Sequence, residues 1–192
     1  MRTLRLLLIC GVAIILAACG EPDLRSKAEG GDSMAQCSLG MMYRKGEGVP
    51  KDAAEAAKWF RKAADQGDAD AQYDLALMYR SGEGVPKDAA EAVKWYRKAA
   101  DQGDAKAQFY LGGMYEKGEG VAKDDAEAYS WYNLASVSYD DARKWRDELE
   151  KSLTPEQRAR AQQRSTELHK EIEAGKNSIW KEIEAAKKAA RK

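Results

Sequence analysis

The chain has 192 residues, of which 33% are charged, and its 32 basic and 32 acidic side chains cancel at neutral pH. This balance leaves no general excess of positive charge, so we expect no nucleic-acid partner. With three cysteines and one histidine, His169, the composition also argues against a disulfide framework and a metal site, and we expect no cofactor.

The first eighteen residues have the pattern of a secretory signal peptide. Two arginines precede an apolar run over residues 6–16 that is short for a membrane span. The run ends in Leu-Ala-Ala-Cys, which resembles the lipobox of bacterial lipoproteins and implies removal of residues 1–18 and lipidation of Cys19. The acyl chains would anchor the protein, since each buried methylene contributes about 0.8 kcal/mol. The alternative is an ordinary signal peptide in which Cys19 is incidental.

The residues after Cys19 bear on location and on the link to the folded part. Gly20 stands where an aspartate would resemble an inner-membrane retention signal, so the lipoprotein resemblance implies an outer-membrane protein facing the periplasm of a Gram-negative bacterium. Pro22 and the pair Gly30-Gly31 argue against a helix that continues from the anchor. We therefore expect residues 19–31 to be the lipidated cysteine and a short tether.

A unit of 36 residues occurs three times and organises the rest of the chain. Its copies include Ala35, Ala71 and Ala107 at the same position and align without a gap until the third diverges after Ala135. Self-similarity at this period is typical of a solenoid, in which each unit buries its apolar face against a neighbour. We assign the repeat domain to residues 32–138, with units at about 32–67, 68–103 and 104–138.

Each unit predicts two helices joined by a turn. Helix A has apolar residues at helical spacing and ends at a glycine, as at Gly82. Helix B follows an aspartate that stands three residues before a glutamate, the spacing of a capping box. Its predicted buried stripe contains a tryptophan, a second aromatic residue and alanines. Small residues on helix A should let that tryptophan pack closely, namely Gly40, Ala76 and Gly112.

Taken together, the Gly-x-Gly-Val turn, the acidic cap, the central tryptophan and Ala-x-Ala-Gln at this period resemble the Sel1-like repeat, a relative of the tetratricopeptide repeat. The resemblance covers about residues 30–138. It implies an all-α fold, a right-handed α-solenoid of paired antiparallel helices that presents a concave surface to other proteins. Cysteine-rich relatives have been associated with hydrolase activity. This chain has one cysteine in its repeats, Cys37, and no nucleophile motif, so we expect no catalytic residue and no enzyme.

The chain after the repeats is expected to close the solenoid. A narrow apolar stripe through Trp145 lies in a charged segment, and Thr154-Pro155 has the pattern of a helix start, so we predict capping helices over residues 139–168. Residues 169–192 carry few apolar side chains and are interrupted by Gly175 and Asn177. We predict a charged, marginally helical tail, with oligomerisation or docking on a partner as the alternative.

Differences among the three copies indicate a binding surface. Three helix-A positions, spaced at i, i+3 and i+6, vary between copies and share one side of the helix. We predict that this surface, the A face, lines the concave side and contacts a partner; drift of a solvated surface is the alternative. Its nine residues are Ser38, Met41, Arg44, Asp74, Leu77, Arg80, Tyr110, Gly113 and Glu116.

Two functions are compatible with this organisation. The first is a lipid-anchored adaptor that binds an unidentified periplasmic or envelope protein. The second is a structural tether whose C-terminal tail contacts peptidoglycan or anionic lipid, because residues 141–192 carry 14 basic and 10 acidic side chains, against 16 and 22 in residues 20–140. A hydrolase related to the cysteine-rich relatives is a third and weaker hypothesis.

Overall fold

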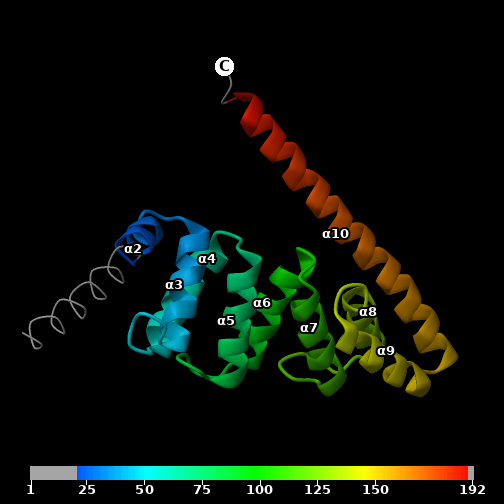
Figure 1. Cartoon of the computed structure of the whole chain (residues 1–192). Helices are drawn as coiled ribbons and strands as arrows, with labels where there is room; N and C mark the ends of the chain where they lie inside the picture. The colour runs from blue at the N-terminus through cyan, green and yellow to red at the C-terminus, as the bar shows by residue number, and fades with distance from the viewer. Residues whose placement is uncertain (1–20, 190–192) are drawn as a thin grey trace, which may run out of the picture.

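The computed structural model describes residues 21–189, and the side chains of residues 24–176 and 178. Cys19 and the predicted signal peptide lie outside the described residues. This part of the chain is all-helical (Figure 1). Its helices are α2 (Glu21–Glu29), α3 (Ser33–Lys45), α4 (Ala53–Asp65), α5 (Ala69–Ser81), α6 (Ala89–Asp101), α7 (Ala105–Lys117), α8 (Asp125–Ala135), α9 (Asp140–Ser152) and α10 (Pro155–Ala189).

The six helices from α3 to α8 form the predicted α-solenoid. Helices α3, α5 and α7 are the A helices, and each packs against the B helix that follows it, α4, α6 or α8. Each repeat then joins the next through α4 on α5 and α6 on α7, so the pairs stand in a row (Figure 1). None of the helices in the described residues is both long and apolar enough to cross a membrane.

The predicted aspartate caps form at every repeat helix, but the capping box is only half made. Asp52 accepts the Glu55 backbone N–H at 3.0 Å. Its own backbone N–H donates to the Tyr43 carbonyl at 2.9 Å instead of to the glutamate. The last carbonyl groups of each A helix have no intrahelical donor, and one of them accepts the hydrogen bond from the backbone N–H of the aspartate. Glu55 is therefore left to pair with Lys58, at 2.9 Å.

The small residues of the A helices face a different ring from the one predicted. A Cβ on Gly40 would lie 2.8 Å from Cδ1 of Phe60, and one on Gly112 would lie 2.9 Å from Cδ1 of Tyr132. The close contact is thus made by the aromatic residue after each tryptophan and not by the tryptophan. The predicted stripe itself is buried in all three repeats, with Trp59, Trp95 and Trp131 at most 5% exposed.

The second glycine of the turn has a role between repeats that the sequence did not reveal. Gly84 has φ +69°, and a Cβ there would lie 2.2 Å from the carbonyl oxygen of Ala53, which begins helix α4 of the preceding repeat. Gly120 approaches Ala89 in the same way, at 2.3 Å. Each turn therefore rests directly on the backbone of its neighbour, an approach that only glycine permits.

The expectation of a tether over residues 19–31 is wrong for residues 21–29, which form helix α2. Ala28 is buried beside Leu39 and Trp59, and Gln36 donates from Nε2 to the Ala28 carbonyl at 2.9 Å. Gln72 makes the same bond to Ala64, 36 residues later. Pro22 lies in the first turn of α2, where proline is tolerated. Helix α2 therefore stands where the B helix of a preceding repeat would stand.

At the other end, the expected interruption at Gly175 and Asn177 is also wrong. Thr154 and Gln157 exchange the two hydrogen bonds of a capping box, at 2.9 and 3.2 Å, at the predicted helix start, and α10 then continues to Ala189. A single glycine costs a helix about 1 kcal/mol, which burial of neighbouring side chains can offset. Ile172 lies in the main core, on the tail side of the predicted boundary at residue 168.

Helices α9 and α10 cover one side of the array only. Helix α9 packs on α8 through Ala142 and Leu149, whereas Trp145 of the predicted stripe is 44% exposed. Helix α10 packs along α8 and reaches α6, both B helices, and its later half projects beyond the repeats (Figure 1). The side formed by the A helices is left for other contacts.

Candidate functional site

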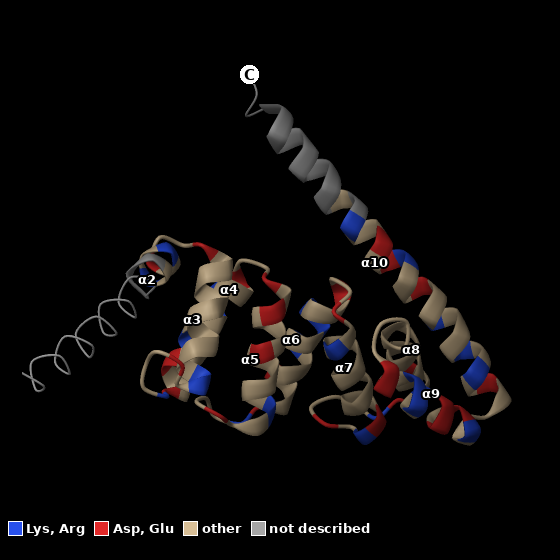
Figure 2. Ribbon diagram, viewed as in Figure 1, with Lys and Arg blue, Asp and Glu red and all other residues tan. Residues whose placement is uncertain are grey.

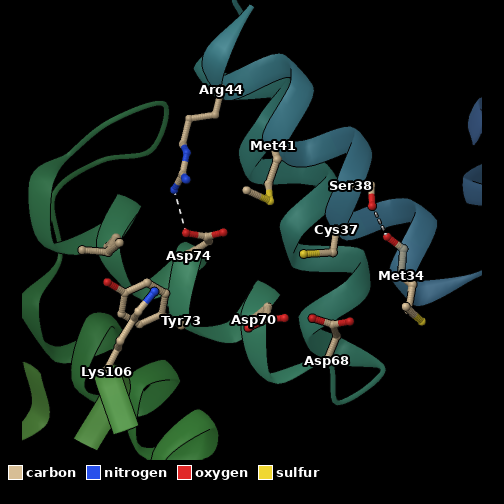
Figure 3. A pocket seen from close by; sticks show the side chains of 11 residues that line it. Met34, Cys37, Ser38, Met41, Arg44, Asp68, Asp70, Tyr73, Asp74 and Lys106 are labelled. Carbon is tan, nitrogen blue, oxygen red and sulfur yellow. Dashed lines mark hydrogen bonds and ion pairs between the residues drawn. The ribbon is translucent and has the colours of Figure 1, made fainter. Parts of the chain in front are cut away.

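A groove of about 550 Å³ opens on the A face between α3 and α5. We call it the α3–α5 groove. Figure 3 shows Cys37 and Met41 on α3 facing Tyr73 and Asp74 on α5. Its size falls within the ~300–1,000 Å³ typical of ligand pockets. Five of the nine predicted partner-binding residues line it, namely Ser38, Met41, Arg44, Asp74 and Leu77.

One end of the groove is held by an ion pair. Arg44 Nη1 donates to Asp74 Oδ1 at 2.7 Å, as the dashed line in Figure 3 shows. Asp74 is only 7% exposed, and burial raises the pKa of its carboxyl above the usual range against the opposing charge of Arg44. The sequence predicted that Arg44 and Asp74 each contact a partner. In the structure the two side chains also pair with each other, and the pair joins the first two repeats.

The floor of the groove contains Cys37. Its side chain is 8% exposed, and burial, followed by the charge of Asp68, raises the pKa of the thiol to about 12. The thiol is therefore protonated at neutral pH and is a poor nucleophile. Cys37 therefore packs as a small, buried apolar residue. In the described residues, no cluster of His, Cys, Asp or Glu side chains is arranged to hold a metal ion.

The four predicted residues outside the groove make contacts within the array. Arg80 lies 5.4 Å from the ring centre of Tyr110 and 3.5 Å from a carboxylate oxygen of Glu119. Glu116 accepts the Tyr132 hydroxyl at 2.7 Å. Gly113 lies beside the same hydroxyl, which a Cβ would approach to 3.3 Å. The A face is thus open in the first repeats and filled in the third.

Six lining residues were not among the predicted site residues. They are Met34, Cys37, Asp68, Asp70, Tyr73 and Lys106. Met34, Asp70 and Lys106 occupy one repeat position, which carries a different residue in every copy, and the same is true of the position of Cys37 and Tyr73. Variation among the copies is therefore a sequence signal for five of these six residues, whereas Asp68 recurs as Asp32 and Asp104 and shows no variation.

The stacked helix pairs and the open A face define an α-solenoid repeat protein. A family model described as Sel1 repeat matches residues 33–68, 69–104 and 105–136. The chain belongs to the Sel1 repeat family. Proteins with these repeats generally mediate protein–protein interaction and act as non-enzymatic scaffolds.

Two solved structures are similar to this chain. A Sel1 repeat protein from Oxalobacter formigenes is 45% identical over 58% of this chain and 46% of its own, with a TM-score of 0.57. The protein c5321, described as a protective antigen of uropathogenic Escherichia coli strains with an SLR fold, is 33% identical over 78% of this chain and 40% of its own, with a TM-score of 0.62. The chain thus spans less than half of each. No protein of curated function matches it.

Proposed function

We propose that the protein is an adaptor, anchored by lipid at Cys19 to the periplasmic side of the outer membrane, that binds a segment of an envelope protein on its A face. The observation that carries the proposal is the α3–α5 groove, which collects five of the nine variable A-face residues in one cavity. We assign no catalytic role, because the one described thiol is buried and protonated.

The surroundings of the groove support a binding role. Met41 and Leu77 are half-buried apolar side chains that line it. Apolar groups at a surface opening with polar neighbours are typical of interaction sites. Helix α10 packs on the B helices of the second and third repeats, α6 and α8, and leaves the A face uncovered.

Site-specific photo-cross-linking in intact cells tests the A face. A photoreactive residue at Leu77 should capture one partner, whereas the same residue at Lys58, which is 69% exposed on α4, should not. Equal products from both positions, or none from any position lining the groove, would contradict the proposal.

The anchor is tested separately. Replacing Cys19 with alanine should move the protein from the membrane fraction to the soluble periplasmic fraction, since the acyl chains supply the attachment. A Cys37→Ala chain is the matched control and should remain in the membrane fraction. Continued sedimentation of the Cys19→Ala protein with membranes would overturn the lipid anchor while leaving the adaptor function open.

A structural tether is the second candidate, and the projection of α10 favours it. The last described contact of α10 with the repeats is that of Lys176 with the region of Gly103, and the helix continues for 13 residues, 177–189. Deleting residues 177–192 spares the buried Ile172. Loss of peptidoglycan or anionic-vesicle association with the Leu77 cross-link intact would assign the tether function to the tail. Unchanged association would remove it.

A further inference from the structure

We propose that the α3–α5 groove is a socket for one aromatic side chain of a partner segment that carries lysine or arginine next to it. The inference rests on the adaptor function proposed above and specifies the chemistry of the segment that docks.

The junction between the second and third repeats shows which side chains fill the equivalent space there. Between α5 and α7, the ring centre of Tyr110 lies 5.8 Å from that of Tyr73 and 5.6 Å from that of Tyr96, on which it is stacked. Phe109 lies 5.5 Å from Tyr110 and 5.1 Å from Tyr139. Aromatic rings thus form a continuous row along the A face from Tyr73 to Tyr139.

The junction between the first and second repeats lacks two of these rings. One period earlier, the position of Tyr73 is held by Cys37 and that of Tyr110 by Asp74. Arg80 lies over Tyr110, whereas its counterpart Arg44 lies 5.6 Å from the ring centre of Phe60 and pairs with the Asp74 carboxylate, which stands where Tyr110 would be. The groove opens where the row stops, with Tyr73 as its wall. An aromatic side chain from a partner would continue the row, and aromatic pairs add about 0.5–1.5 kcal/mol beyond the area that they bury.

The charge at one end of the groove selects the neighbouring residue. Asp68 and Asp70 begin α5 there, opposite the single ammonium group of Lys106. Asp70 is exposed, whereas Asp68 accepts the Ala71 backbone N–H at 2.8 Å and lies within hydrogen-bond reach of the Cys37 thiol. At the other end Arg44 and Asp74 neutralise each other. The excess charge is negative and lies beside the socket, so it favours a cationic neighbour for the inserted ring.

A short peptide tests the recognition directly. Acetyl-Gly-Lys-Phe-Lys-Gly-amide should bind the purified protein saturably and shift backbone amide NMR signals of residues 34–44 and 70–77. Replacing its phenylalanine with alanine should weaken binding by at least about tenfold, since a buried ring contributes most of the area. Replacing both lysines with glutamate should weaken it by about two- to fivefold or more. Equal affinity for the phenylalanine and alanine peptides would overturn the proposal.

The repeats themselves supply the matched variants. Cys37→Phe introduces the residue that the third repeat has as Phe109, so it should fill the socket and abolish peptide binding while the far-ultraviolet circular dichroism is preserved. Lys58→Phe adds the same ring at a side chain that is 69% exposed on α4, outside the groove, and should bind as the unaltered chain does. If the Cys37→Phe protein fails to fold, Asp74→Tyr, which copies Tyr110, fills the same space. Peptide binding by a folded, filled variant at the affinity of the Lys58→Phe protein would overturn the socket.

Cross-linking from Leu77 in chains that carry these substitutions separates the aromatic socket from the adaptor function. If Leu77 captures a partner in cells and Cys37→Phe leaves that capture unchanged, the adaptor function stands and the aromatic socket is wrong. If Cys37→Phe abolishes the capture and Lys58→Phe does not, both are supported. If no position lining the groove captures a partner, the adaptor function fails, whatever the peptide does.

Discussion

The two ends of the repeat array are closed in different ways. At the N-terminal end, α2 keeps the 36-residue spacing: Arg25 donates to the Tyr43 hydroxyl at 2.6 Å, as Arg97 donates to the Tyr115 hydroxyl at 2.7 Å two periods later. At the C-terminal end, α9 and α10 abandon that spacing. One end therefore reuses the contacts that join neighbouring repeats, and the other makes contacts found nowhere else in the described chain.

Glu127 is the centre of the contacts at the C-terminal end. It is 13% exposed in its side chain, accepts Trp131 Nε1–H at 3.0 Å, and pairs with Arg97 at 3.5 Å and with Arg164 of α10 at 3.2 Å. Figure 2 shows the alternating charges of α10 along this side of α8. The cap outside the repeat spacing thus adds a partly buried charge network, whereas the half-repeat cap reuses the packing and hydrogen bonds that join neighbouring repeats. We expect the C-terminal end to be the more stable one.

The largest expected difference is between the two outer tryptophans. Trp131→Ala should lower the free energy of unfolding by about 4–5 kcal/mol, and Trp59→Ala by about 3 kcal/mol. Trp131 is fully buried, and its loss also removes a donor from Glu127, whereas Trp59 is 5% exposed and its Nε1–H has no partner among the described residues. Urea denaturation followed by circular dichroism measures both. A larger loss for Trp59→Ala would reverse the comparison.

The cap helices themselves give the next effect. Leu168→Ala should cost about 2–4 kcal/mol, since this side chain of α10 is 1% exposed in the main core. Leu24→Ala on α2 should cost about 1 kcal/mol, because Leu24 is only partly buried at the edge of a smaller cluster. Equal shifts in urea midpoint would show that α2 and α10 contribute alike.

The sequence predicted the helices of the repeats because local signals and packing agree there. The aspartate caps, the terminal glycines and the alternation of large and small residues all mark the same boundaries. Helix α2 was not predicted, because Pro22 and Gly30-Gly31 are typical of a tether. A sequence signal for this helix is nevertheless present, since Arg25, Ala28 and Asp32 stand one period before Arg61, Ala64 and Asp68.

The candidate site was predictable only in part. The variable positions located the A face, since residues fixed by the fold recur and the others differ. They did not reveal that Asp74 would pair with Arg44, or that Tyr110 would stack on Tyr96, because those contacts join different repeats and depend on side-chain direction. The course of α10 was missed because its stability comes from Leu168 and Ile172 packing on the B helices and not from its own propensity.

A smaller effect should separate equivalent glutamates. Glu127→Gln removes a partly buried charge from between Arg97 and Arg164 and should cost about 1–3 kcal/mol. Glu91→Gln, at the same position of the second repeat, loses an exposed pair with Lys94 and should cost about 0–0.5 kcal/mol. Thermal unfolding in 0.05 M and 1 M salt measures both. The loss of stability in Glu127→Gln should persist in 1 M salt. Its disappearance there would show that salt screens the contacts of Glu127 with Arg97 and Arg164.

The smallest expected effect is at the N-terminal end, and the Cys37 thiol can report it. Burial holds the pKa of this thiol at about 12, so at pH 8 the closed protein presents almost no thiolate, and local opening should accelerate alkylation. In a chain with Cys10 and Cys19 replaced by serine, Arg25→Ala should weaken the contact of α2 with Tyr43 by about 0.5 kcal/mol and raise the alkylation rate of Cys37 about twofold.

Lys151→Ala is the matched control for that measurement, because it removes a 70% exposed cation from α9 at the opposite end of the array. It should leave the alkylation rate unchanged, since the opening that exposes Cys37 involves the first repeat alone. Equal acceleration by both substitutions would mean that Cys37 becomes exposed only when the whole array unfolds. The two ends would then belong to one cooperative unit, and the difference between their caps would affect total stability without creating a weaker end.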